Sequence, residues 1–137
     1  MSRLIVILCA LTLSPILAVS AGGDESNAEL YFISPADGDT VKNPVIVRFG
    51  LKNMGVAPAG SDIPNTGHHH LLIDTALPAM NVPIGKDDQH RHFGGGHTET
   101  STVLSPGTHT LRLLLGDFTH IPHDPPVVSE QITVTVE

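Results

Sequence analysis

Apolar and polar residues alternate along several short stretches of the chain, and a period of two is typical of half-buried β-strands. The clearest stretch is residues 45–51, where Val45, Val47, Phe49 and Leu51 share one side. The same criteria predict strands at residues 30–34, 67–75, 98–104, 108–115 and 127–136. No segment has the apolar spacing of an amphipathic helix, so we expect strands alone.

Turns rich in Pro, Gly and Asp separate these stretches. About six or seven short strands at this spacing predict an all-β fold, a small antiparallel immunoglobulin-like β-sandwich. Ser105-Pro106-Gly107 lies between two of the predicted strands, and we expect it to join them as a hairpin. The Cys-Trp-Cys pattern of true immunoglobulin domains is missing from the sequence, so the prediction concerns architecture alone.

The N-terminus has the pattern of a secretory signal peptide over residues 1–21, with Arg3, an apolar run and small residues up to Ala21. The apolar run is shorter than the roughly 20 residues that a spanning helix needs. We therefore expect a periplasmic or secreted protein with no membrane span after cleavage. Residues 22–29 are predicted to be a flexible lead-in, and residues 30–137 a single β-sandwich domain.

Composition narrows the chemistry of the exported chain. Its one cysteine, Cys9, lies in the signal peptide, which excludes thiolate metal sites and cysteine nucleophiles from the mature protein. The net charge is −7, and −8 once Arg3 is removed with the signal peptide. Nucleic acid is a poor partner for such a surface, because phosphate binding needs clustered cations.

Histidine is unusually frequent, with nine residues in a chain that is only 4% aromatic. Three of them are consecutive at positions 68–70. Because side chains alternate across a strand, His68 and His70 should share one face, roughly 6.6 Å apart, which lets both reach one ion. His69 should face the core with Leu71 and Ile73, as a buried histidine bonded to the backbone.

Two further pairs follow on loops. His90 and His92 precede the triple glycine 94–96, which permits a close backbone approach or a positive φ. His120 and His123 flank Pro122, which stiffens their loop before anything binds. His109 opens a strand at the rim of the core, where being a ligand and orienting one are equally compatible with the sequence.

Such pairs in a thiol-free domain predict a site for copper or zinc, since calcium prefers oxygen ligands. Copper is slightly favoured because Met54 and Met80 could assist Cu(I). The alternative is that all the histidines are structural or solvated. The preferred ligands are His68, His70 and His92, followed by His120 and His123. Further candidates are His69, His90 and His109, with Asp117 and Asp124 as carboxylates that orient an imidazole.

Four segments carry a resemblance to a known family: TGHHHLLID, HRHFGGG, PGTHTLRLLLGD and HIPHDPPVVSEQITVTV. Together they resemble a family of exported bacterial domains of unknown function, over about residues 31–136. The resemblance implies a small periplasmic β-rich domain and no established activity. Relatives often have glutamine at the position of His97, which makes His97 the weakest metal candidate.

Three functions remain open on the sequence. The first is a periplasmic metal-binding protein for storage, delivery or resistance. The second is a non-catalytic envelope interaction module with structural histidines, whose partner is another periplasmic protein. The third and least favoured is a metal-dependent enzyme, because no serine, cysteine or paired-carboxylate constellation is recognisable.

Overall fold

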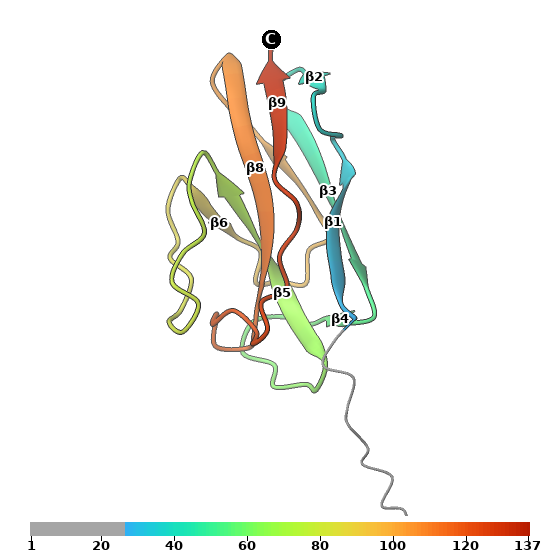
Figure 1. Ribbon diagram of the computed structural model, residues 1–137, viewed down its shortest axis with the longest axis vertical. Coiled ribbons are helices and arrows are strands. Elements are labelled where there is room, and N and C mark those ends of the chain that lie inside the picture. Colours follow the sequence, from blue (N-terminus) through green and yellow to red (C-terminus); the bar gives the residue numbers. More distant parts are fainter. Residues whose placement is uncertain (1–26) are drawn as a thin grey trace, which may run out of the picture.

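The computed structural model describes residues 27–137, which form a β-sandwich of two sheets without a helix (Figure 1). The smaller sheet has the order β1-β3-β7, with strands Glu29–Ser34, Val45–Lys52 and Glu99–Thr102. The larger has the order β2-β9-β8-β5-β4, with strands Thr40–Val41, Ile132–Val136, Gly107–Gly116, Thr66–Ile73 and Gly55–Val56. A further strand, β6 (His90–His92), also pairs with β5. The all-β sandwich predicted from the sequence is confirmed.

Most strand pairs are antiparallel, as expected, and the exceptions are the short parallel pairs β2–β9 and β4–β5. The strands that the sequence did not predict are the short ones, β2, β4 and β6. The predicted signal peptide, residues 1–21, lies outside the described residues. The predicted lead-in lies there too, apart from its last three residues, and Glu29 already belongs to β1. In residues 27–137, nothing helical has the length and hydropathy that a bilayer crossing requires.

The core lies between the two sheets and follows the alternation seen in the sequence. Val45, Val47 and Phe49 of β3 are buried, while the residues between them in the first half of the strand are exposed. They pack against apolar residues of β5, β8 and β9, namely Leu71, Ile73, Leu111, Leu113, Leu115, Ile132, Val134 and Val136. Period-two burial therefore defines the inner face of each main strand.

The predicted hairpin of residues 98–104 and 108–115 is wrong. β7 pairs with β3 in the small sheet, whereas β8 lies between β5 and β9 in the large one. The side-chain amide of Asn43 binds both backbone groups of Leu104, at 2.7 and 3.1 Å, and fixes the chain where it leaves the small sheet. Turn residues such as Ser105-Pro106-Gly107 mark a change of direction but do not specify which strands pair.

Strand β5 is the central element for the site, because it is buried on both faces. Its inner face, turned toward the small sheet, carries Leu71 and Ile73. Its outer face carries Leu72, which packs with Ile84 and Leu114 in a second apolar cluster. The loops that follow β5 and β8 cover this outer face, and the Ile84 N–H donates to the His120 carbonyl at 2.8 Å between them. Side chains on the outer face of β5 are therefore as inaccessible to solvent as those in the core.

Candidate metal centre

Two imidazoles project from the outer face of β5 just before Leu72. The rings of His68 and His70 have their centres 4.8 Å apart and side by side, as the period of a strand requires. Their residues are only 1% and 0% exposed. Two residues that are next to each other on one face of a strand thus place two solvent-inaccessible imidazoles together.

Strand β6 adds a third imidazole. It pairs antiparallel with β5 so that His92 lies opposite His70. The His92 ring centre is 5.2 Å from that of His70 and 5.1 Å from that of His68. Each of these three residues offers a ring nitrogen within 4.8 Å of the other two. Cross-strand neighbours on the same face are close enough to share a ligand.

The loop after β8 supplies a fourth ring, that of His120. Asp117 fixes this loop, because its Oδ1 accepts hydrogen bonds from the Thr119 N–H, the Thr119 hydroxyl and the Ile121 N–H, at 2.7–3.0 Å. His120 has a φ of 71°, an uncommon conformation for a residue with a side chain. Its ring centre lies 4.9 Å from His68 and 4.7 Å from His92. We call His68, His70, His92 and His120 the histidine cluster.

Glycines make room for these rings. Gly116 of β8 pairs with His68 of β5. A Cβ built on Gly116 would lie 2.8 Å from Cε1 of His70. A Cβ on Gly94 would collide with the His92 ring. The triple glycine therefore provides both features that the sequence suggested, a close approach at Gly94 and a positive φ of 80° at Gly96. The role of Gly116 was missed, although a glycine that ends a strand of leucines was a signal for it.

Burial favours the neutral form of three of these imidazoles, those of His68, His70 and His92. It lowers the pKa of His68 to about 4 and that of His70 to about 3, with the neighbouring histidines adding to both shifts. The pKa of His92 is lowered by burial, then by His120 and Lys86. Within the described part of the chain, no hydrogen-bond partner meets Nε2 of His68, either ring nitrogen of His70, or Nε2 of His92. Neutral imidazoles with free nitrogen lone pairs are metal-ligand donors.

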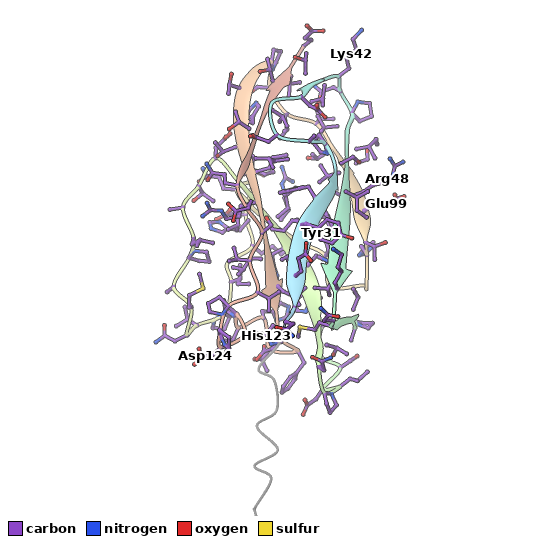
Figure 2. The ribbon with its side chains drawn as sticks, turned by 45° about the vertical axis from the view of Figure 1, so that its right-hand side comes forward. Tyr31, Lys42, Arg48, Glu99, His123 and Asp124 are labelled. Atoms are coloured by element: carbon purple, nitrogen blue, oxygen red, sulfur yellow. The ribbon has the colours of Figure 1, made fainter. Side chains whose placement is uncertain are left out.

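His123 lies beside the cluster rather than in it. Its Nε2 faces Gly67, where an added Cβ would lie only 2.7 Å away. Burial lowers its pKa, against the attraction of Asp117, and no partner for Nε2 occurs among the described residues. Asp124 is exposed, and Figure 2 shows it projecting outward beside His123. Asp117 serves chiefly to fix the loop of His120, although its charge also reaches His68 and His123.

His69 points the other way, as strand alternation predicts. It is 1% exposed, lies 4.9 Å from the Phe49 ring, and donates from Nδ1 to the His97 carbonyl at 3.1 Å. Burial lowers its pKa to about 4, and the bond to His97 opposes that shift. His69 therefore belongs to the sandwich core and not to the histidine cluster.

His90 and His109 are engaged by carboxylates. Nδ1 of His90 lies 2.8 Å from Asp87, and Nδ1 of His109 lies 2.6 Å from Asp74. Nε2 of His109 donates to the Ser105 carbonyl at 2.8 Å. The Asp74 and Ser105 acceptors raise the pKa of His109 above its ordinary value. Both ring nitrogens of His109 are occupied, so the structure gives it a structural contact in place of a free donor.

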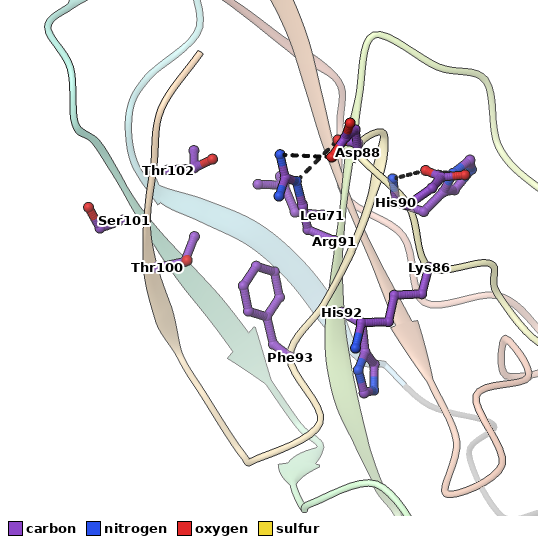
Figure 3. Close-up of a pocket in the computed structure, with 11 residues that line it drawn as sticks. Leu71, Lys86, Asp88, His90, Arg91, His92, Phe93, Thr100, Ser101 and Thr102 are labelled. Atoms are coloured by element: carbon purple, nitrogen blue, oxygen red, sulfur yellow. Dashed lines mark hydrogen bonds and ion pairs between the residues drawn. The ribbon is translucent and has the colours of Figure 1, made fainter.

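A pocket of about 480 Å³ lies on the other side of β6, between β6 and β7. Arg91 and Phe93 point into it toward residues 100–102, and His92 also borders it with its ring directed away from those residues, as Figure 3 shows. Met54 and Met80 lie outside this pocket and outside the histidine cluster. Met54 packs against the sandwich core and Met80 against the second apolar cluster. Neither methionine is part of the histidine cluster.

Comparison with known proteins gives one result. No curated protein and no solved structure matched the chain. A family model described as "Domain of unknown function (DUF4399)" matches residues 47–137, a range that begins in β3 and includes all the histidines. Because this match covers well over half of the chain, the protein belongs to the DUF4399 family.

Proposed function

We propose that this chain is an exported, periplasmic metal-binding protein that holds copper or zinc in its histidine cluster, for storage, delivery or resistance. One observation carries the proposal. His68, His70 and His92 place a ring nitrogen each within 4.8 Å of the others. Metal–nitrogen bonds of about 2.0–2.1 Å place tetrahedral donors about 3.4 Å apart, so the rings must move closer together when an ion binds.

The energetics of the metal-free protein point in the same direction. A buried polar atom without a partner costs about 1–3 kcal/mol, and four ring nitrogens of the three residues are in that position in the described chain. This cost lowers the stability of the metal-free protein, so a structural role does not explain the unbonded nitrogens. A metal ion bound by one nitrogen of each ring would offset the cost at three of the four, because coordination replaces the missing hydrogen bonds.

The surroundings favour holding an ion over chemical turnover. The nearest acid on the cluster side, Asp117, has its Oδ1 occupied by three hydrogen bonds within its own loop. Its carboxylate therefore serves the loop of His120, and no other carboxylate in the described part of the chain contributes to the pKa shifts of His68, His70 and His92. His92 and His120 are only partly buried, whereas His68 and His70 are fully buried, so the cluster is accessible to an ion from the side of the first two.

Titration of metal-stripped protein with Zn(II) and with Cu(II), followed by calorimetry, tests the proposal. We expect one ion per chain, bound more tightly than about 10 μM. Binding should also stabilise the fold by about 2.7 kcal/mol at a free metal concentration 100 times the Kd, and a chelator should reverse the effect. Absence of stoichiometric binding below about 10 μM for both metals would refute the proposal.

The pocket between β6 and β7 supports a second candidate, a non-catalytic envelope interaction module. β6 and β7 are edge strands of opposite sheets, and edge strands can pair with an added strand. A pull-down from periplasmic extract tests it. A partner retained after chelation, and lost when Arg91 and Phe93 are replaced by alanine, would favour this function. If chelation removes the partner from the unsubstituted protein, the result would favour the metal-binding function.

A further inference from the structure

The six distances between the ring centres of the histidine cluster show that the four rings do not lie in one plane but surround a common centre. His68, His70 and His92 form a triangle with sides of 4.8, 5.1 and 5.2 Å. His120 caps this triangle, 4.9 Å from His68, 4.7 Å from His92 and 6.2 Å from His70. Five of the six distances therefore fall between 4.7 and 5.2 Å.

These distances distinguish between coordination geometries. With bonds of about 2.0–2.1 Å, an imidazole ring centre lies about 3.2 Å from the metal, so tetrahedral ligands have centres about 5.2 Å apart. A square-planar set would give four separations of about 4.5 Å and two diagonals of about 6.4 Å. If His70 and His120 formed one diagonal, His68 and His92 would form the other, and they are only 5.1 Å apart. The cluster matches a tetrahedron with one edge opened.

We infer that His120 is the fourth ligand and that the cluster binds Zn(II) as a closed, tetrahedral, four-imidazole site. This inference rests on the proposed metal-binding function and deepens it by naming the ion and its coordination. Tetragonal ligand sets suit Cu(II) and Ni(II), whereas four-coordinate tetrahedral sets suit zinc.

The donor set agrees with zinc. Sulfur ligands would favour Cu(I), but Met54 and Met80 pack into the two apolar clusters, and the four clustered side chains offer nitrogen alone. Four protein ligands also leave no position for a water molecule, which is typical of zinc sites that do not catalyse hydrolysis.

Closing the site requires the rings to move closer together, and His120 most of all, because only His68, His70 and His92 have ring nitrogens within 4.8 Å of one another in the described part of the chain. The distance between His70 and His120 must shorten by about 1 Å to reach the tetrahedral value. His70 is fully buried on β5, whereas His120 is partly exposed on a loop. The adjustment therefore falls to the His120 ring, which places the entry and release of the ion at this residue.

Substitution with Co(II), which reports coordination geometry through its visible absorption, tests the inference. The metal-stripped protein should give the intense visible bands of tetrahedral Co(II), and one equivalent of Zn(II) should abolish them. Weak bands of the octahedral kind, with tight metal binding retained, would overturn the tetrahedral site and leave the proposed function standing. Failure to bind Co(II), Zn(II) or Cu(II) would overturn both.

The variant His120→Asn isolates the fourth ligand. Asparagine tolerates the positive φ of this position, so the loop should keep its conformation. We expect Zn(II) affinity to fall at least tenfold and the Co(II) bands to weaken, with the apo melting temperature unchanged. The matched control is His97→Asn, which removes an exposed imidazole outside the cluster and should alter affinity less than twofold. Equal affinities and spectra for the two variants would show that His120 is not a ligand.

Discussion

Two groups of histidines in this domain have the same side chain and opposite surroundings. In the histidine cluster, His68 and His70 are buried with ring nitrogens that no described residue bonds, and burial lowers their pKa values. His109 lies at the rim with both ring nitrogens bonded, and its carboxylate partner raises its pKa. The first arrangement costs stability in the metal-free protein, whereas the second provides it.

The difference in hydrogen bonding between the two groups indicates which histidines can still bind a ligand. A carboxylate beside an imidazole favours the imidazolium, which has no lone pair to offer a metal. The pair His109–Asp74 is therefore complete as a structural contact, and Nδ1 of His90 is likewise occupied by Asp87 at 2.8 Å. The cluster instead packs imidazoles against one another, and the pKa values of His68, His70 and His92 are lowered by burial first and then by neighbouring histidines. Spacing in the sequence does not separate the two groups, since both contain histidines on strands.

The largest expected effect comes from His70→Leu. Loss of a central ligand should weaken metal binding at least 100-fold, because the remaining donors cannot complete the site. The metal-free protein should keep its stability or gain about 1–2 kcal/mol, because two buried nitrogens without described partners are replaced by an apolar group of similar size. Metal titration and denaturant unfolding of the apo protein measure the two effects. A strong loss of apo stability with binding retained would make His70 structural.

Acid should destabilise the metal-free protein over a defined range. His68 and His70 have folded pKa values of about 4 and about 3, below the value near 6.5 expected when unfolded. The unfolded chain then binds protons first, so stability is full above pH about 6.5 and declines as pH falls toward 4. Each histidine contributes up to about 1.4 kcal/mol per pH unit. Denaturant unfolding at several pH values measures the slope, and the double variant His68→Leu, His70→Leu should reduce it to the part that His69, also with a pKa of about 4, and the other buried histidines contribute.

The His109 pair should give a smaller effect with the opposite sign. A raised pKa of His109 means that its contribution is full below pH about 6.5 and is lost as pH rises through the folded value. The pKa of Asp74 is lowered, since its hydrogen bonds from His109 and Thr110 outweigh its partial burial, so its contribution is lost only at acid pH.

The variant His109→Gln should therefore cost about 1 kcal/mol near pH 5.5 and less at pH 9, the modest size reflecting the 43% exposure of the Asp74 side chain. Titration of His109 by NMR should give a pKa above 6.5 in the parent protein. Metal affinity should not change in this variant. An equal cost at both pH values would show that the pair is not charged.

The smallest expected effect concerns Lys86, a cation whose charge reaches His92. A positive charge close to a cation site opposes binding, but solvent screens a side chain as exposed as this one. Lys86→Gln should therefore tighten metal binding about twofold to fivefold at low salt, and the gain should shrink at high salt. Lys42→Gln, at the far end of the sandwich in Figure 2, is the control. A gain that does not depend on salt would indicate a cause other than charge.

The sequence by itself determined the local geometry of this protein. A period of two fixed the inner faces of β3, β5 and β9, and it separated His69 from His68 and His70, because successive side chains on a strand point to opposite faces. Turn residues placed most loops correctly. The family resemblance also agreed with the DUF4399 match over residues 47–137.

Only the tertiary structure decided which strands pair and which histidines come together. Strand pairing is a long-range choice, which is why the hairpin predicted around Ser105-Pro106-Gly107 was wrong and why β6 was expected to be loop. The register of β6 on β5 brings His92 to His70, and the loop fixed by Asp117 brings His120 to both. No local pattern encodes those distances, because they depend on how strands far apart in the chain align and on the loops that cover β5.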